Sequence, residues 1–218
     1  MIHLEVLVED TSGKIMLDKL LPMIFEDIAT VTYAVHSYKG VGRVPKNLQP
    51  NGKSRGRMLL DSLPKLLDGY GKTFSHWPLN TAGAVVLVCD LDDKPLVSFK
   101  KQLEGILEAC STQPETRFCF AIEEGEAWLL GDIPAIEAAY PKVQKSILRH
   151  YKNDTICGTW EVLAEALSFK YKNAAWYACG QKKAEWAEQI TPYMNIESNE
   201  SPSFQYFVKT VRDLAKPR

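Results

Sequence analysis

The sequence predicts an α/β fold in which a mainly parallel β-sheet is flanked by helices and followed by a helical C-terminal extension. Short aliphatic runs alternate with segments of helical periodicity through about the first 140 residues, and parallel strands joined by crossover helices produce this alternation. Residues 84–89 are continuously apolar, as expected for a strand covered on both faces. No convincing strand follows Lys142, which indicates that the rest of the chain is helical.

The first strand is predicted at residues 2–8, which are rich in aliphatic side chains. Asp10, Ser12 and Gly13 follow it and are typical of a turn and a helix N-cap. Apolar side chains then recur with helical spacing over 14–28, although Pro22 should kink or interrupt this helix. The further elements expected are a strand at 31–36, a Gly- and Pro-rich loop at 40–56, a helix at 58–67, the central strand at 84–89, a helix at 98–110 and a strand at 117–122.

The last part of the chain is helical in pattern. One or two short helices are expected over 126–140, interrupted at Pro134. Longer helical patterns cover 160–169, 182–190 and 203–214, and Ser201 and Pro202 form a good start for the last of them. We therefore expect a core over residues 1–140 and a helical extension over residues 141–218 packed on it.

Composition and charge exclude several classes of protein. Apolar residues make up 45% and charged residues 24%, which is typical of globular proteins and excludes a disordered chain. The 26 basic residues balance 27 acidic ones, so no overall field attracts nucleic acid. The longest apolar stretch is much shorter than the roughly 20 residues of a membrane span, and the first residues do not resemble a signal peptide. We expect a cytoplasmic protein that has no membrane partner.

Acidic residues follow three of the predicted strands. Glu9 comes after the first strand and Glu123 after the last, while Asp90 and Asp92 follow the central one. Because the carboxyl ends of parallel strands form one edge of a sheet, we expect these acids to meet in one crevice. Like charges at close range persist only where they share protons or hold a cation, and oxygen-rich clusters select Mg²⁺ or Mn²⁺. The sequence therefore predicts a divalent-metal site.

The spacing of these acids supports a shared site. Asp90 and Asp92 are alternate residues, which point the same way in an extended segment. Glu126 lies three residues after Glu123 and shares a helix face with it if a helix starts there, so it is a further candidate ligand. Turn formation or capping explains any single aspartate equally well. Glutamate is a poor cap and turn residue, so Glu9 and Glu123 favour a functional site.

Three short motifs give the sequence a resemblance to a known superfamily. They are Leu-Val-Glu9-Asp-Thr-Ser-Gly, Val-Cys-Asp90-Leu-Asp92-Asp and Ala-Ile-Glu123-Glu-Gly-Glu126-Ala-Trp. In this order, at strand ends, they resemble the Toprim domain, a Rossmann-like metal-binding fold of topoisomerases, primases and OLD-type nucleases. The chain is most similar to small stand-alone Toprim-like proteins of the OLD-nuclease-like branch, a domain-of-unknown-function family suspected in phage defence.

The resemblance implies roles for individual residues. Glu9 matches the first-motif glutamate, which is a metal ligand or a general acid/base. Asp90 and Asp92 match the D-x-D metal ligands, and Glu123, with Glu126, would supply the further acid of the nuclease branch. The glycine that usually follows the first glutamate is Asp10 here.

Nuclease activity is the Toprim chemistry that a chain of 218 residues can carry. A metal held by carboxylates activates water and neutralises charge on a phosphate. A topoisomerase needs a separate tyrosine-bearing domain, and a primase needs template-handling parts that we do not find. We therefore predict a Mg²⁺- or Mn²⁺-dependent nuclease in which Glu9, Asp90, Asp92 and Glu123 are the catalytic acids.

Binding to nucleic acid requires local positive charge. Residues 39–57 hold six basic residues and no acid, namely Lys39, Arg43, Lys46, Lys53, Arg55 and Arg57. A loop of this kind neutralises phosphates without reading sequence, although an ordinary solvated loop has the same composition. Four lysines are candidates for a basic group near the metal, although lysines on helices mostly face solvent: Lys170, Lys172, Lys182 and Lys183. Four aromatic residues either stack on bases or pack between helices: Trp160, Trp176, Tyr177 and Trp186.

Two rival interpretations stay open. Asp90-Leu-Asp92 at a strand end is also found in phosphatases of the haloacid-dehalogenase type, but the Thr or Val that this family has two residues later is Lys94 here. A non-catalytic Toprim-like subunit would bind a metal or a partner protein without cleaving phosphodiesters. The sequence has no G-x-x-x-x-G-K-[ST] motif, so energy from nucleotide hydrolysis would come from a separate ATPase subunit.

Overall fold

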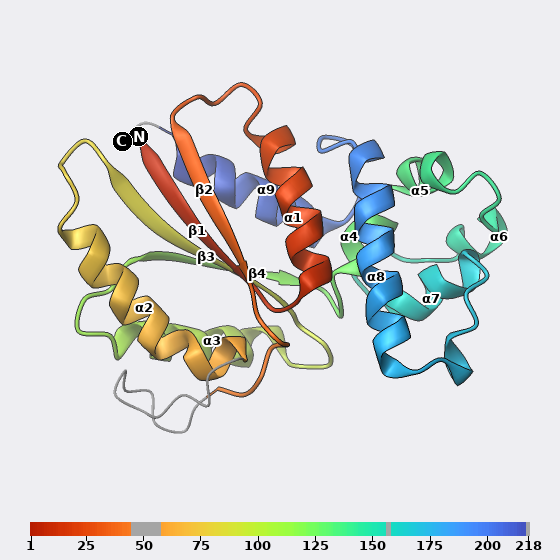
Figure 1. Cartoon of the computed structure of the whole chain (residues 1–218), viewed down its shortest axis with the longest axis horizontal. Helices are drawn as coiled ribbons and strands as arrows, with labels where there is room; N and C mark the ends of the chain where they lie inside the picture. The colour runs from red at the N-terminus through yellow and green to blue at the C-terminus, as the bar shows by residue number, and fades with distance from the viewer. Residues whose placement is uncertain (45–57, 156–157, 217–218) are drawn as a thin grey trace.

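The structure is a computed structural model that describes residues 1–44, 58–155 and 158–216. Within these residues, four strands form one all-parallel sheet of order β2-β1-β3-β4 (Figure 1). The strands are β1 (Ile2–Val8), β2 (Val31–Ser37), β3 (Ala82–Asp90) and β4 (Glu115–Ala121). The predicted α/β class is confirmed, and β3 lies inside the sheet between β1 and β4, as its apolar sequence predicts.

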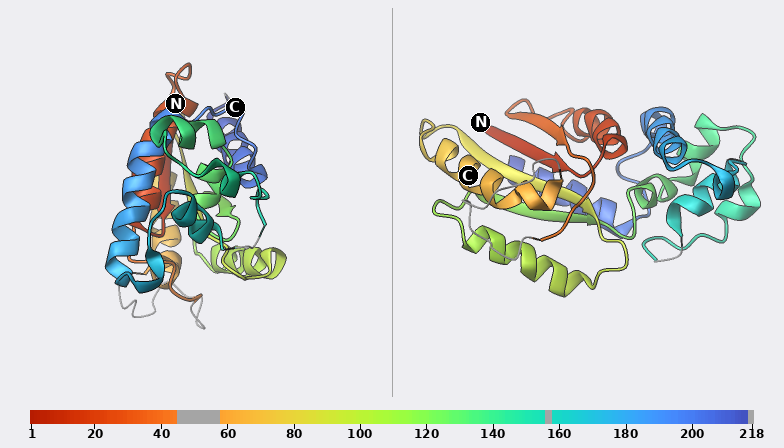
Figure 2. Two further views of the ribbon diagram at one scale, coloured as in Figure 1. Left: turned by 90° about the vertical axis from the view of Figure 1, so that its right-hand side faces the viewer. Right: turned by 60° about the horizontal axis from the view of Figure 1, so that its bottom comes forward.

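Helices cover both faces of the sheet (Figure 2). One face carries α1 (Thr11–Ile24) and α9 (Pro202–Ala215), and the other carries α2 (Leu59–Ser75) and α3 (Leu96–Glu108). Because successive strand side chains point to opposite faces, Leu4 of β1 packs in the core with α1 and α9, whereas Leu7 packs with α2 and α3. Burial of one such leucine contributes about 1.5–3 kcal/mol relative to its exposure.

The other helices gather beyond the carboxyl ends of the strands (Figure 1). They are α4 (Glu126–Leu130), α5 (Ile133–Ala139), α6 (Lys145–Leu148), α7 (Thr159–Ala166) and α8 (Trp176–Ile190), with short 3-10 helices at Tyr171–Asn173 and Thr191–Tyr193. α8 packs against α1, where Lys19 and Glu188 form an ion pair of 2.8 Å. One core runs from the sheet into these helices, and the division near residue 140 stays a prediction.

The start of α1 follows from its capping residue. Asp10 is the N-cap, and its carboxylate accepts a 2.7 Å hydrogen bond from the Gly13 N–H. This bond satisfies a donor that the first turn would otherwise leave free. α1 therefore begins at Thr11, not at 14, and it ends at Ile24, not at 28, with Pro22 inside its last turn.

Two further helices are longer than predicted, and one cap is confirmed. α2 continues to Ser75 and α8 begins at Trp176 instead of 182. Both extensions carry polar or exposed side chains, so their apolar periodicity is weak. Ser201 caps α9 as predicted, since its hydroxyl accepts a hydrogen bond from the Phe204 N–H. Among the described residues, no helix combines the length and apolar character that crossing a membrane requires.

Candidate metal-binding acidic site

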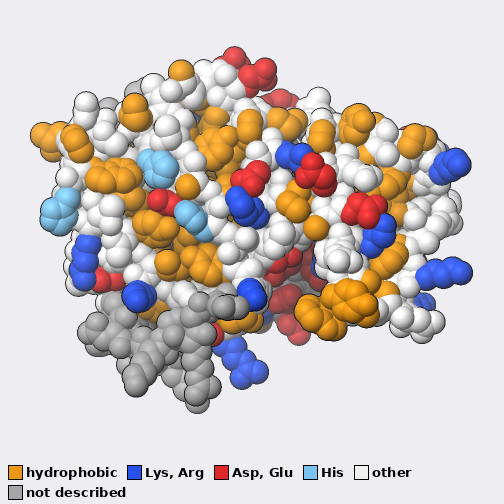
Figure 3. Space-filling view, in the orientation of Figure 1, with side chains coloured by type: hydrophobic (Ala, Val, Ile, Leu, Met, Phe, Trp, Pro, Cys, Tyr) orange, Lys and Arg blue, Asp and Glu red, His pale blue; other side chains and the backbone are white. Residues whose placement is uncertain are grey.

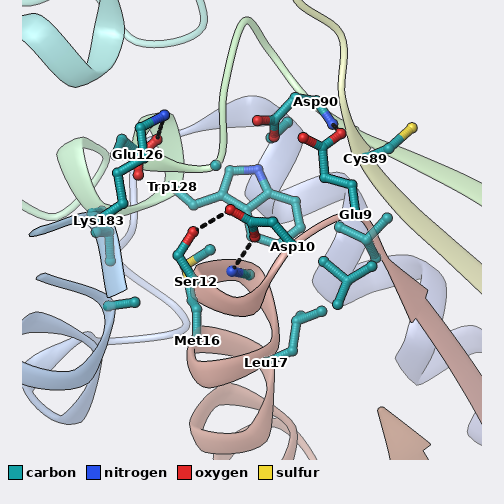
Figure 4. Close-up of a pocket in the computed structure, with 17 residues that line it drawn as sticks. Glu9, Asp10, Ser12, Met16, Leu17, Cys89, Asp90, Glu126, Trp128 and Lys183 are labelled. Carbon is teal, nitrogen blue, oxygen red and sulfur yellow. Dashed lines mark hydrogen bonds and ion pairs between the residues drawn. The ribbon is translucent and has the colours of Figure 1, made fainter. Parts of the chain in front are cut away.

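Two acidic side chains meet at the carboxyl edge of the sheet. Glu9 directly follows β1, and Asp90 is the last residue of β3, the strand beside it. Figure 4 shows the two carboxyl groups next to each other, and the Asp90 N–H donates a 3.2 Å hydrogen bond to Oε2 of Glu9. Both residues line a cavity of about 30 Å³, which has room for one or two water molecules. The topology thus places two of the expected acids in one site.

Burial makes these two acids hard to ionise. It is the main cause that raises the pKa of Glu9 to about 7, and the charges of Asp10 and Asp92 add to the effect. Burial also raises the pKa of Asp90 well above its usual range, with further contributions from Glu9 and Glu126. Without a cation, burial therefore favours the protonated, uncharged forms of both carboxyl groups. A bound cation would favour their charged forms.

A third acid and a lysine complete the opposite wall of the cavity. Glu126 begins α4 and is buried, and Lys183 comes from α8. The Lys183 Nζ lies 3.3 Å from Oε2 of Glu126 and 3.1 Å from Oε1 of Glu124. These carboxylates raise the pKa of Lys183, so it stays charged. The ammonium group thus pairs with two glutamates, and Glu9 and Asp90 lie across the cavity from it (Figure 4).

Glu124 was absent from the residues predicted from sequence. Burial raises its pKa to about 7. Its Oε2 atom is buried and has no hydrogen-bond partner among the described residues. A buried carboxylate oxygen without a partner, close to the charge of Glu126, is the kind of group that a cation would stabilise.

Asp92 does not line the cavity. Its backbone has φ 50°, in the left-handed region, so the alternation expected of an extended segment fails after Leu91. The Asp92 carboxylate forms an ion pair with Lys94. Its charge still contributes to the raised pKa of Glu9.

Glu123 holds the start of α7. Its carboxylate accepts hydrogen bonds from the N–H groups of Gly158 at 2.9 Å and Thr159 at 2.6 Å, and from the Thr159 hydroxyl. α4 begins at Glu126, so Glu123 precedes that helix and the expected i, i+3 pair on one helix face does not form. This glutamate acts as a cap for another helix, delivered from a distant part of the chain.

Replacing Glu123 by alanine is expected to lower the free energy of unfolding by about 1–3 kcal/mol in the presence of a metal chelator. The variant leaves two N–H groups at the start of α7 without an acceptor. Urea unfolding would measure the loss, with Glu26→Ala, at an exposed carboxylate, as a control within about 0.5 kcal/mol of the wild type. A more stable Glu123→Ala protein would mean that, without metal, repulsion by the other acids outweighs the hydrogen bonds of this carboxylate.

The match to a known family covers nearly all of this architecture. The model of a family described as a domain of unknown function, DUF4276, matches residues 8–212. The chain belongs to the DUF4276 family. No curated protein and no solved structure matches it. The matched DUF4276 region contains every acid of the site, whereas the finer resemblance to Toprim domains rests on the three sequence motifs alone.

The chemistry of this DUF4276 site fits a hard divalent cation, although its geometry is incomplete. Carboxylate oxygens are the ligands that Mg²⁺ and Mn²⁺ prefer, and a cation in the cavity would favour the charged forms of Glu9 and Asp90 that burial disfavours. Across residues 1–44, 58–155 and 158–216, no three acidic, histidine or cysteine side chains converge closely enough to hold a metal. Glu9 and Asp90 are the pair that would bind it, with Glu126 across the cavity.

The predicted basic segment starts next to this site. Lys39 and Arg43 are exposed, and the Gly40 N–H between them donates a 2.7 Å hydrogen bond to the Glu9 carbonyl. The other four basic residues of the prediction, Lys46, Lys53, Arg55 and Arg57, lie outside the described residues. The start of the basic segment is therefore joined to Glu9 by a backbone hydrogen bond.

The candidate lysines and aromatic residues of the last part of the chain have different surroundings in the structure. Of the four lysines, Lys183 is the one that lines the cavity, whereas Lys182 pairs with Glu185 and Lys172 lies over the Tyr171 ring. Trp186 is buried in the core. Trp160 packs beneath the Lys183 ammonium, with 5.4 Å from Nζ to the ring centroid. Trp176 and Tyr177 are exposed.

Proposed function

We propose that this chain is a Toprim-type nuclease that hydrolyses phosphodiester bonds of DNA or RNA with Mg²⁺ or Mn²⁺. The observation that carries the proposal is the pair Glu9 and Asp90, two largely buried carboxyl groups from adjacent parallel strands that share one cavity. Buried acids that outnumber the nearby lysine either take up protons or hold a cation. The position at the carboxyl edge of a parallel sheet is where such folds bind ligands.

In this proposal the residues of the site have different roles. Glu9 and Asp90 hold the metal, and Glu126 supports them from α4. The bound ion would lower the pKa of a water molecule and neutralise phosphate charge. Lys183 keeps a fixed positive charge at the side of the cavity, where it stabilises charge that develops on the phosphate. Asp92 and Glu123 act from outside the cavity, through charge and through helix capping.

Lys39 and Arg43 would bind the nucleic-acid backbone. Both are exposed and begin a basic segment at the sheet edge that carries Glu9. Contacts of this kind neutralise phosphates and make binding weaken steeply with salt. They carry no sequence information, so the proposal is for a nuclease with little sequence preference.

The test is cleavage of supercoiled plasmid, single-stranded DNA and RNA in Mg²⁺ or Mn²⁺. We expect Glu9→Ala and Asp90→Ala to lose at least about 100-fold in rate, because each removes a metal ligand. Glu26→Ala, at an exposed carboxylate in the connection between α1 and β2, should cleave like the wild type. Equal cleavage by the wild type and Asp90→Ala would assign the activity elsewhere.

A second candidate function is a non-catalytic subunit that binds a metal or a partner protein. It is favoured by the incomplete donor geometry among the described residues, since a partner could supply what is missing. A gated nuclease would share this feature, and we extend the proposal to an anti-phage effector controlled by a separate ATPase subunit. Metal that raises the melting temperature through Asp90, without any cleavage, would favour this second candidate.

A further inference from the structure

Two large aromatic side chains stand in solvent at the start of α8. Trp176 is 86% exposed and Tyr177 is 60% exposed, and their ring centroids lie 6.4 Å apart in an edge-to-face arrangement. Neighbouring large apolar side chains that are exposed together are a feature of interaction sites. In the orientation of Figure 1, Figure 3 shows an apolar patch at this end of α8, next to a hollow that exposes acidic side chains.

One face of α8 connects these rings to the acidic cavity. Trp176, Gly180 and Lys183 follow each other at helical spacing, and Ala187 continues the row. Lys183 and Ala187 line the cavity. At 1.5 Å per residue, Trp176 lies about 10 Å along the helix axis from Lys183. A strand of a few nucleotides can span this distance.

Gly180 leaves the path between the two ends open. No heavy atom lies within 4 Å of the point where a Cβ atom would be placed at this position. Its backbone is helical, so no unusual conformation requires a glycine there, and glycine is a poor helix former. The missing side chain therefore provides space on the face of the helix, halfway between the rings and the cavity.

The charge around the rings fits a phosphate backbone. Residues 170–183 contain four lysines and no acid. Lys172 lies over the Tyr171 ring at 5.9 Å from Nζ to the centroid, and Lys183 lies at the cavity. Aromatic rings that alternate with lysines are the features that proteins use to bind single strands, because every base has a face that can stack.

We propose that Trp176 and Tyr177 form a stacking platform for an unpaired base, so that the substrate class of the site is single-stranded nucleic acid. The inference rests on the proposed nuclease function for its cleavage step, but not for the binding itself. A base stacked on Trp176 would place the following backbone along Gly180 and toward the acids at the sheet edge. Paired bases in a duplex do not offer a free face to this platform.

The experiment measures binding separately from cleavage. Fluorescence anisotropy of labelled 12-nucleotide oligo(dT), oligo(U) and a matched duplex is recorded in EDTA, where metal-dependent cleavage cannot occur. We expect Trp176→Ala to weaken single-strand binding by roughly 5- to 100-fold, Trp176→Phe to retain most of the affinity, and duplex binding to change less than about twofold. Tyr193→Ala, at another exposed aromatic residue that is 57% exposed, is the control and should bind like the wild type.

A second pair of variants tests the path. Gly180→Leu should weaken single-strand binding because the side chain fills the space along α8. Gly69→Leu is the matched control, since Gly69 also lies within a helix, α2, and also has no heavy atom within 4 Å of its Cβ position. Both substitutions favour the helix, so a loss of binding in Gly180→Leu alone cannot come from unfolding.

Failure of the platform and failure of the nuclease give different results. Binding that depends on Trp176 in a protein that cleaves nothing supports the platform and removes the nuclease. Cleavage and binding that are unchanged in Trp176→Ala support the nuclease and overturn the platform. The platform is also overturned if the wild type binds no oligonucleotide or prefers the duplex, in which case the exposed rings serve as a docking surface for another protein.

Discussion

Replacing Lys183 by methionine is expected to lower the free energy of unfolding by about 3–5 kcal/mol at pH 8 in EDTA. Lys183 is the ammonium group that faces the buried carboxylates of Glu124 and Glu126. Methionine keeps an apolar stem of similar length over the Trp160 ring, so packing changes little. The loss comes from leaving buried negative charge without a partner. It should shrink toward pH 5, where these carboxyl groups can take up protons instead.

The neighbouring lysine provides a matched control for this variant. Lys182 pairs with Glu185 at 2.6 Å, but both side chains are more than a third exposed, and pairs of this kind contribute less than about 1 kcal/mol. Urea unfolding of Lys182→Met and Lys183→Met at both pH values separates the two sites. Equal losses in the two variants would contradict the view that Lys183 is the counter-charge of the acidic cavity.

Metal binding gives an independent measurement for Lys183→Met. Removing a positive charge from a site that binds a cation strengthens that binding, so Mg²⁺ should raise the melting temperature of the variant more than that of the wild type. A purely structural lysine would leave the Mg²⁺ effect unchanged. The two readouts therefore move in opposite directions, with lower stability of the free protein and a larger gain from metal.

The sequence could predict the acidic pair because parallel topology fixes where strands end. Once residues 2–8 and 84–89 are recognised as neighbouring parallel strands, Glu9 and Asp90 must lie at one edge of the sheet. The N-caps of α1 and α9 were predictable for a similar reason, since Asp10 and Ser201 act on backbone groups within three residues of themselves. Local rules suffice where the partner is local.

The remaining features depend on partners that are distant in the chain. The Glu123 carboxylate accepts hydrogen bonds from Gly158 and Thr159, which are about 35 residues away in the chain. The sequence around Glu123 does not indicate these partners. The positive φ of Asp92 turns its side chain out of the alternation that the D-x-D spacing implies. Lys183 was one of four similar lysines, and its role follows only from the packing of α8 beside α1 and α4.

The turn after β1 has Asp10 at the position where a Toprim domain usually has glycine, and its backbone conformation shows why glycine is not required. Asp10 has φ −143°, an extended conformation that any residue adopts. The turn after β1 therefore does not need a glycine. In its place Asp10 accepts hydrogen bonds from the Gly13 N–H and the Ser12 hydroxyl, and it adds negative charge that raises the pKa of Glu9.

The pH dependence of stability should identify Glu9 as an acid that folding keeps protonated. Its pKa rises from 4.5 to about 7 on folding, which corresponds to about 3 kcal/mol. Between these pH values the folded chain holds a proton that the unfolded chain has lost, so the free energy of unfolding falls as the pH rises. Glu9→Gln has no such proton to lose. It should be more stable than the wild type by up to about 3 kcal/mol above pH 7, in EDTA, and Glu26→Gln should show no such gain.

Divalent metal should reverse this behaviour in the wild type alone. Mg²⁺ must displace the protons of Glu9 and Asp90, so its stabilising effect should grow as the pH rises from 6 to 8. In Glu9→Gln and Asp90→Asn the effect should be lost, and both variants should be more stable without metal than the wild type is. This pattern, a cost to the stability of the free protein that is offset when the ion binds, is what we expect of metal ligands. A Mg²⁺ effect of equal size in wild type and Asp90→Asn would place the metal away from the sheet edge, and a less stable Glu9→Gln protein at pH 8 would show that its carboxylate is a structural partner instead.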